Sequence, residues 1–310
     1  MTGLVRIGLV GAGRLAEVGY LPAAAAARDV VLAAVAEPDP VRRDRVAALA
    51  RGVPAFPDAA ALLAGTDVDA LVLATPAAAH LGDARLGAVE GLPVLVEKPP
   101  APDRAGAAAL TALEPAPYVA FNRRFDPAIA ALRAATPAGA EVAVVAEIAY
   151  RRGGWGAHAV ADDALLDLGP HLVDLARWIT KADVTRVRRA SVTPERAEFD
   201  LELGAARARI RCATDRLHHE RVEVRHRDGT VVGCHRVGGP VDAVLGRLRT
   251  GPHPLVTSLT AELEAFARTV RGHPDPVLGR AADGVAVMAV LDEVRARAVH
   301  HPSARTISGV

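Results

Sequence analysis

The stretch Val5-Arg-Ile-Gly-Leu-Val-Gly-Ala-Gly-Arg-Leu-Ala16 decides which fold the first part of the chain is expected to adopt. An apolar run of strand character leads directly into a glycine-rich turn and then into a stretch of helical character. Gly11 permits the tight turn, Gly13 lets the backbone approach a pyrophosphate, and Ala16 allows close helix–sheet packing. The residues expected at the pyrophosphate are Gly11, Ala12, Gly13, Arg14 and Leu15. We therefore predict a dinucleotide-binding loop at a helix N-terminus, with a ligand-free glycine turn as the alternative.

The first 120 residues continue this alternation of strand and helix. Apolar runs occupy residues 5–10, 30–36, 70–74, 93–96 and 118–121. Alanine- and arginine-rich segments of helical periodicity lie between them, at residues 14–27, 41–50, 79–90 and 103–113. Apolar strands separated by helices are typical of a parallel sheet covered on both faces. We predict an α/β Rossmann domain, a doubly wound parallel sheet, over residues 1–121.

The pattern changes after about Asn122. An alternating strand is expected at residues 141–151 and an amphipathic helix at 165–179. Further strands are expected at 184–192, 196–203, 205–212, 221–227 and 230–236, and helices at 256–271 and 280–299. Asp228-Gly229, between the last two strands, is a hairpin signal. Residues 122–310 are therefore predicted to form an α+β domain with a mainly antiparallel open sheet.

The composition excludes several classes of protein. The chain has 310 residues and a net charge of +1, which leaves no basic field to hold nucleic acid or anionic lipid. No window reaches the roughly 18 apolar residues that span a bilayer, and no room for a signal peptide precedes the first strand. Cys212 and Cys234 have neither metal-ligand nor redox spacing and are interpreted as buried apolar residues. We predict a cytoplasmic protein without a metal site, a nucleic-acid partner or a membrane partner.

Lysine is nearly absent from this chain. It occurs only at Lys98 and Lys181 among 37 basic residues, and asparagine occurs only at Asn122. Arginine cannot release a proton at working pH whereas lysine can. A lysine retained in a loop under this bias is therefore a candidate for proton chemistry. Lys98 follows an apolar strand in Glu97-Lys98-Pro99, and a surface amine is the alternative interpretation.

Glu37 ends the second expected strand, 26 residues after Gly11. An acid at this place accepts both ribose hydroxyls of an adenosine and repels a 2′-phosphate. The sequence therefore favours NAD(H) as the cofactor. Arg42 and Arg43, one helical turn beyond, could instead bind that phosphate, so NADP(H) stays open.

Two other places carry candidate chemistry. Ligands of doubly wound sheets bind beyond the carboxyl ends of the strands, where Thr75-Pro76 and Glu97-Lys98 are expected. In the second half, Asp167 and His171 are four residues apart, which places both on one face of a helix. An acid beside a histidine orients the ring for acid–base chemistry, whereas a histidine packed in the core is the plainer alternative.

Together these stretches resemble the Gfo/Idh/MocA oxidoreductases, the family of glucose–fructose oxidoreductase and the inositol dehydrogenases. The motifs that carry the resemblance are Gly11–Ala16, Glu37-Pro-Asp-Pro40, Thr75-Pro76 with His80, Glu97-Lys98-Pro99, Asn122-Arg-Arg-Phe-Asp-Pro127 and Asp167-x-Gly-x-His171-x-x-Asp174. Their order and spacing are more specific than any one of them. The resemblance implies that Glu37, Thr75, Pro76, His80, Glu97 and Lys98 line the cofactor.

The resemblance also implies a catalytic set. Lys98 would bind the reacting oxygen and take part in a proton relay, His171 would be the general acid/base, and Asp167 would support it. The implied reaction exchanges a hydride between nicotinamide and a hydroxyl or ketone carbon of a sugar, nucleotide sugar or cyclitol. The second domain's sheet would build a homodimer or homotetramer.

Two further residues are substrate candidates. Arg124 could bind a phosphate or carboxylate or pack against the sheet, and Trp155 could stack on a sugar ring or anchor its loop. Family members commonly have a glycine-rich run before the catalytic Asp, where this chain has Asp162-Asp-Ala164, and this departure leaves the substrate open. The rival functions are a reductase of a specialised biosynthetic ketone or imine, and a non-catalytic NAD(P)-binding regulatory protein.

Overall fold

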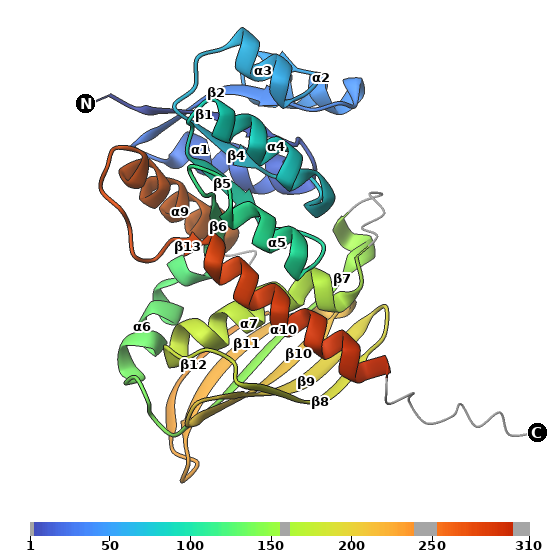
Figure 1. Ribbon diagram of the computed structural model, residues 1–310, viewed down its shortest axis with the longest axis vertical. Helices are drawn as coiled ribbons and strands as arrows, with labels where there is room; N and C mark the ends of the chain where they lie inside the picture. Colours follow the sequence, from blue (N-terminus) through green and yellow to red (C-terminus); the bar gives the residue numbers. More distant parts are fainter. Residues whose placement is uncertain (1–2, 156–161, 239–252, 300–310) are drawn as a thin grey trace, which may run out of the picture. The chain divides into compact units, whose positions relative to one another are not determined.

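The computed structural model describes residues 3–155, 162–238 and 253–299 (Figure 1). The chain divides into two compact units. The first unit comprises Met1–Ala130 and Arg249–Met288, and the second comprises Ala131–Leu248 and Ala289–Val310. Helices α6 (Pro127–Ala135) and α10 (Ala281–Val299) each begin in the first unit and end in the second.

The first unit is built on a seven-stranded sheet with the strand order β13-β6-β5-β4-β1-β2-β3. Its strands are β1 (Val5–Val10), β2 (Val30–Ala36), β3 (Ala55–Phe56), β4 (Ala70–Leu73), β5 (Val94–Glu97), β6 (Tyr118–Ala120) and β13 (Gly279–Arg280). All pairs are parallel except the edge pair of β6 and β13. The order reverses between β1 and β4, which is the switch point where doubly wound sheets bind ligands. The predicted Rossmann fold is confirmed.

Helices cover both faces of this sheet because its strands are apolar on both sides. One face packs against α3 (Ala59–Gly65), α4 (Ala77–Val89) and α5 (Arg104–Thr111). The other face packs against the π-helix η1 (Ala16–Tyr20), α1 (Leu21–Ala26) and α9 (Pro254–Val270). The remaining helical segments are α2 (Pro40–Leu49) and the short η2 (Asn122–Phe125). Asp39, Asp58 and Asp103 cap α2, α3 and α5, since each carboxylate accepts a backbone N–H three residues later.

The return of α9 to the first unit differs from the boundary expected at residue 121/122. Leu259, Leu263 and Phe266 are fully buried in the cluster that also contains Ile7 and Leu95 of the parallel sheet. The helix itself was predicted correctly, but its amphipathic pattern does not reveal which sheet its apolar stripe covers. The first unit is therefore discontinuous in sequence.

The second unit contains a six-stranded sheet with the strand order β12-β11-β7-β10-β9-β8. Its strands are β7 (Val142–Arg151), β8 (Arg186–Val192), β9 (Arg196–Leu203), β10 (Ala206–Ala213), β11 (Asp215–His226) and β12 (Val231–Gly238). Only β7 and β10 pair in parallel, so the predicted mainly antiparallel sheet is confirmed. Helix α7 (Ala164–Thr180) packs on one face, against β7, β9 and β10.

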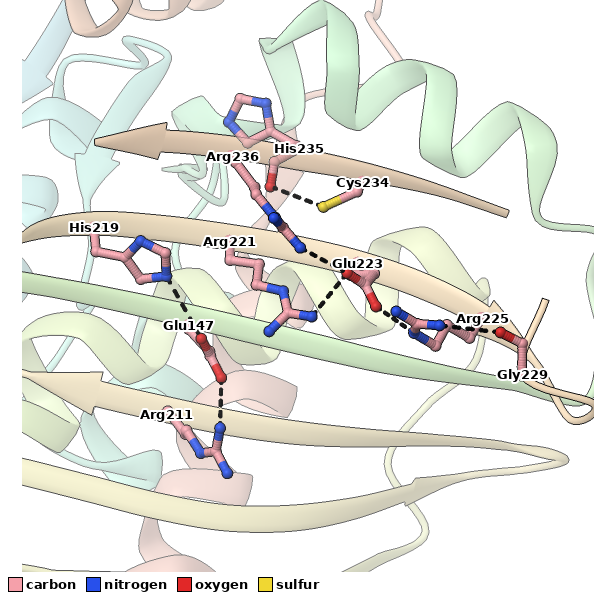
Figure 2. A network of polar contacts seen from close by, with 10 residues as sticks. All are labelled: Glu147, Arg211, His219, Arg221, Glu223, Arg225, Gly229, Cys234, His235 and Arg236. Atoms are coloured by element: carbon pink, nitrogen blue, oxygen red, sulfur yellow. Dashed lines mark hydrogen bonds and ion pairs between the residues drawn. The ribbon is translucent and has the colours of Figure 1, made fainter. Parts of the chain in front are cut away.

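The opposite face of this sheet is strongly charged (Figure 2). Glu223 of β11 is only 2% exposed because the guanidinium groups of Arg221, Arg225 and Arg236 surround its carboxylate. These hydrogen bonds lower the pKa of Glu223 to about 2. Cys234 pairs with Glu223 across the ladder and is exposed, so the prediction that it is buried is wrong. Cys212 is buried as predicted, and burial raises the pKa of its thiol.

No helix within the described residues is long and apolar enough to cross a membrane. The same part of the chain contains no group of three or more His, Cys, Asp or Glu residues placed to hold a metal ion.

Candidate functional site

The glycine loop joins β1 to η1 at the switch point of the parallel sheet. Gly11 has a φ of +95°, and a Cβ there would lie 2.6 Å from the backbone of Ala74, so only glycine fits without strain. At Gly13, by contrast, no described atom lies within 4 Å of an added Cβ. The fold of this unit therefore does not itself require a glycine at position 13. Open space beside a helix N-terminus fits a pyrophosphate that approaches the backbone.

Arg14 and Leu15 leave the loop in different directions. Arg14 is exposed and forms an ion pair with Glu17 (3.5 Å). Leu15 is partly buried and packs against the apolar cluster beneath the sheet. Only the backbone of Leu15 is therefore offered to a ligand, while the side chain of Arg14 remains available at the surface.

Glu37, directly after β2, forms a hydrogen bond with the backbone of the glycine loop. Its Oε2 accepts the N–H of Ala12 (2.9 Å), and its Oε1 accepts the N–H of Asp39 (3.0 Å) and the Nη2 of Arg42 (2.8 Å). The side chain is 3% exposed, and its hydrogen bond is the main cause that raises the pKa of Arg42. Arg43 donates to the carbonyl of Glu37 (2.8 Å). The acid predicted for the ribose is thus held beside the glycine loop, and it engages Arg42, the predicted phosphate ligand.

His80 of α4 contacts both the loop after β4 and the loop after β5. Its ring nitrogens face the carbonyl oxygens of Thr75 (2.8 Å) and Pro100 (3.2 Å), and the side chain is 1% exposed. Burial lowers the pKa of His80, and its contacts with these backbone carbonyls oppose that lowering. Thr75 also donates its hydroxyl to Asp83 (3.1 Å), and Pro76 precedes the first turn of α4. His80 therefore supports both loops from within the protein.

Glu97 and Lys98 lie at the carboxyl end of β5, as predicted. The carboxylate of Glu97 is buried, with Oε1 accepting the Tyr20 hydroxyl (2.7 Å) and Oε2 accepting the N–H of Lys98 (2.9 Å). Burial raises the pKa of Glu97, while the charge of Lys98 and these hydrogen bonds oppose that rise. Glu97 thus faces the interior, and Lys98 is partly exposed beyond it.

Asp167 and His171 lie one turn apart on α7 in the second unit. Asp163 caps this helix by accepting the N–H of Leu166 (2.8 Å), and it is itself held by Arg295 (2.9 Å). Both candidate side chains are partly exposed, unlike most residues of α7. The predicted placement on a single helix is confirmed.

Two neighbours of Asp167 were not predicted. The hydroxyl of Tyr150, at the end of β7, donates a hydrogen bond to Oδ2 of Asp167, and the Nη2 of Arg152 lies 3.3 Å from the same oxygen. Burial and the charge of Asp167 raise the pKa of Tyr150, so its hydroxyl stays protonated as a donor. A compositional signal existed, because the chain has only three tyrosines. Two of them, Tyr20 and Tyr150, bind acids of the candidate site.

Of the two substrate candidates, Arg124 and Trp155, the structure describes the side chain of Arg124 alone. Arg124 is 4% exposed, and its guanidinium bonds the carbonyl of Val277 (3.3 Å), pairs with Asp283 (3.2 Å) and lies over the ring of Phe121 (5.1 Å). These contacts indicate the packing role rather than a substrate ligand. Trp155 ends the short helix η3 (Arg152–Trp155), and its side chain lies outside the described part of the structure.

The first unit thus combines a doubly wound sheet with a glycine loop at its switch point, and the second unit carries Asp167 and His171 on one helix. Residues 5–118 match the model of the Gfo/Idh/MocA oxidoreductase family, described as an oxidoreductase family with an NAD-binding Rossmann fold. Over these residues the match confirms the resemblance predicted from the sequence motifs.

Relatives with stated activities match part of the chain. Inositol 2-dehydrogenase of Acidothermus cellulolyticus is 34% identical over 190 residues, which is 59% of this chain and 56% of that protein. A dTDP-3,4-didehydro-2,6-dideoxy-alpha-D-glucose 3-reductase of Streptomyces antibioticus is 39% identical over 109 residues, 35% of this chain and 33% of that one. The matched region thus spans little more than half the length of the inositol 2-dehydrogenase.

The fold extends further than the sequence similarity. The crystal structure of myo-inositol 2-dehydrogenase from Lactobacillus plantarum superimposes with a TM-score of 0.80 and 17% identity, covering 96% of this chain and 98% of that chain. Both units of the present chain therefore have the architecture of that structure.

Proposed function

We propose that the protein is an NAD(P)-dependent oxidoreductase that exchanges a hydride with a CH–OH or C=O carbon of a cyclitol, sugar or nucleotide sugar. The observation that carries this proposal is the hydrogen-bonded Asp167 on α7, one turn before His171, in a chain that also carries a dinucleotide loop. A sensor of the nucleotide requires the glycine loop but no acid–base pair. The names of the partial relatives, an inositol dehydrogenase and a nucleotide-sugar reductase, support a polyol substrate.

In the proposed mechanism the chain's own residues bind the reactants and handle the proton. Gly11, Gly13 and the N-terminus of η1 would hold the cofactor's pyrophosphate, and NAD(P), when bound, supplies hydride chemistry. Lys98 would bind the reacting oxygen and share its proton with His171. Asp167 would orient the imidazole and bind a neighbouring hydroxyl, while Tyr150 and Arg152 hold its carboxylate in place.

We further propose that NAD(H) is preferred over NADP(H). In support, the buried carboxylate of Glu37 follows β2 and bonds the glycine loop, and a 2′-phosphate bound beside it would meet its negative charge. Arg42 is already bonded to Glu37 through two of its nitrogens, so its charge is partly neutralised. Measured dissociation constants for NADH and NADPH test this preference directly.

The charged outer face of the second unit's sheet supports a homo-oligomer, which we propose forms through that face. Three acids on β9, Glu198, Asp200 and Glu202, lie between arginines of β8 and β10 and form ion pairs with them. Rows of alternating charge are complementary to a second copy related by a twofold axis. Light scattering after gel filtration should report a dimer or tetramer, and Asp200→Arg should shift it toward the monomer. Arg85→Glu, on the exposed face of α4, is the control; a monomeric wild type would exclude this proposal.

The function is tested first by nicotinamide absorbance. Purified protein is mixed with NAD and separately with NADP, and screened against inositols, sugars and sugar nucleotides. A rise in reduced nicotinamide with one polyol would support the proposed dehydrogenase. Tight NADH binding without turnover of any polyol would instead favour a specialised ketone or imine substrate, or a regulatory protein.

A further inference from the structure

Tyr20 forms an unexpected link beneath the end of β5. It is 1% exposed, and its hydroxyl donates to Oε1 of Glu97 over 2.7 Å, across 77 residues of sequence. The other oxygen of the same carboxylate accepts the backbone N–H of Lys98 over 2.9 Å. One buried carboxylate therefore connects the helix that follows the glycine loop to the backbone of the candidate catalytic lysine.

The local structure around Tyr20 is built for this contact. Tyr20 ends the π-helix η1, a rare helical form that often occurs at functional sites. Gly19 permits the packing, because a Cβ there would lie 2.8 Å from Leu259 of α9. The wider turn places the Tyr20 side chain inward, where Glu262, fully buried on α9, adds its negative charge.

The surroundings of Tyr20 allow its hydroxyl to act only as a hydrogen-bond donor. Burial, followed by the charges of Glu97 and Glu262, raises the pKa of Tyr20 well above its ordinary value. The hydroxyl therefore stays protonated and acts as a donor to Glu97. Burial raises the pKa of Glu97, and the Tyr20 hydrogen bond is one of the contacts that oppose this rise by stabilising the ionised carboxylate.

We propose that Tyr20 is a positioning residue: its hydroxyl holds the carboxylate of Glu97, and Glu97 in turn fixes Lys98 at the end of β5. This inference rests on the proposed role of Lys98 in the reaction. The loss of the hydroxyl leaves Oε1 of Glu97 without a donor that a buried carboxylate needs. Glu97 then takes up a proton at higher pH, and Lys98 loses the neighbouring negative charge with which its own charge interacts.

The scarcity of lysine makes a direct measurement feasible. The chain has only two lysines, so Lys181→Arg leaves Lys98 as the single side-chain signal in protein labelled with ¹³C at lysine Cε. The chemical shift of that signal is followed against pH in the full-length protein without substrate. The protonation of Glu97 should appear as a change of this chemical shift at acidic pH. Such an acidic step is assigned to Glu97 if it disappears in Glu97→Gln.

Tyr20→Phe in this background should move the acidic step to higher pH. Tyr118→Phe is the matched control, because Tyr118 lies on β6 of the same unit and packs edge-on against Phe266 in the same core cluster. A step at the wild-type pH in Tyr20→Phe, or an equal shift in Tyr118→Phe, would overturn the proposal. Should Tyr20→Phe not fold, 3-fluorotyrosine replaces all three tyrosines. Its more acidic hydroxyl donates a stronger hydrogen bond, so the step should move to lower pH, and no movement would count against the role of Tyr20.

A kinetic comparison separates this inference from the proposed function. Where a substrate is turned over, Tyr20→Phe should lower kcat about tenfold, the size of a supporting-residue effect, with KM for the nicotinamide cofactor unchanged. An unaltered kcat with an unaltered pH profile would overturn the positioning role. If the wild type turns over no substrate, the proposed function fails, while the lysine signal still decides whether Tyr20 acts on Glu97 and Lys98.

Discussion

The two units of this protein support their candidate catalytic residues with the same chemical pair in different surroundings. In the first unit Tyr20 donates to Glu97, both are buried, and the carboxylate continues to Lys98 through the backbone. In the second unit Tyr150 donates to Asp167, which is partly exposed and also contacts Arg152. The first pair can only hold its neighbour in place, whereas the second carboxylate is accessible to a substrate.

This contrast suggests different roles for the two acids, Glu97 and Asp167. Glu97 is buried and accepts a hydrogen bond from Tyr20, which belongs to the apolar cluster beneath the parallel sheet, so little water competes for this bond. Asp167, the acid proposed to meet a substrate hydroxyl, is partly exposed and forms an ion pair with Arg152. Loss of the buried Tyr20–Glu97 pair should therefore cost more stability than loss of the partly exposed Tyr150–Asp167 pair, and changes at the glycine loop and Glu37 should alter cofactor binding.

The largest expected effect comes from His171→Ala. Loss of general acid–base assistance should lower kcat by about 10²–10⁴-fold, since no other side chain of α7 replaces the imidazole. Binding of NADH, measured by fluorescence titration, should remain at the wild-type level because the dinucleotide loop belongs to the first unit. His226→Ala, an exposed histidine of the second unit, is the control. Wild-type turnover in His171→Ala would contradict the assignment of the acid/base.

Glu37→Ala tests whether the first unit binds the cofactor through Glu37. Removing charge-assisted hydrogen bonds to a ribose should weaken NADH binding by about 10–100-fold, which corresponds to about 1.5–3 kcal/mol. NADPH binding should improve because Arg42 is released from the carboxylate. Both dissociation constants are measured beside the exposed control Glu90→Ala. An unchanged NADH to NADPH ratio would show that Glu37 does not select the cofactor.

Tyr20→Phe and Tyr150→Phe compare the two pairs by stability. Tyr20→Phe should lower the free energy of unfolding by about 1–3 kcal/mol, because it leaves a buried carboxylate oxygen without its donor. Tyr150→Phe should lower it by about 1 kcal/mol or less, since Arg152 and water still reach Asp167.

Urea unfolding is followed by far-UV circular dichroism and by tryptophan fluorescence. Both tryptophans, Trp155 and Trp178, belong to the second unit, so coincident transitions in Tyr20→Phe would show that the units unfold together. Equal losses in the two variants would contradict the difference in burial.

Glu223→Gln should have the smallest effect, and one that depends on pH. The arginines hold the pKa of Glu223 at about 2, below its ordinary value of 4.5, so its ionisation stabilises the folded state above pH 4.5. That contribution decreases as the pH falls from 4.5 through 2. The variant should be less stable than wild type by about 1 kcal/mol at pH 7 and equally stable near pH 2. The control is Glu141→Gln, whose ion pair with Arg227 is exposed. A constant difference across this range would exclude the role of charge.

Much of the first unit could be predicted from the sequence. Five of its seven strands, most of the helices between them and the glycine loop were found, because each depends on residues that are neighbours along the chain. The same holds for the helix that carries Asp167 and His171 and for the hairpin at Asp228-Gly229. The short elements β3, α3 and β13 were missed. The exposure of Cys234 was missed, since alternation alone does not say which face of a strand is covered.

The sequence by itself determined the local elements and the kinds of residue offered at the strand ends. Only the tertiary structure decided that α9 returns to the parallel sheet, that Arg124 is used by Asp283, and that Tyr20 and Tyr150 each bind a distant acid. The physical reason is the range of the interactions. Periodicity and turn chemistry act over a few residues, whereas these contacts join segments 17 to 159 residues apart and exist only once apolar faces have packed.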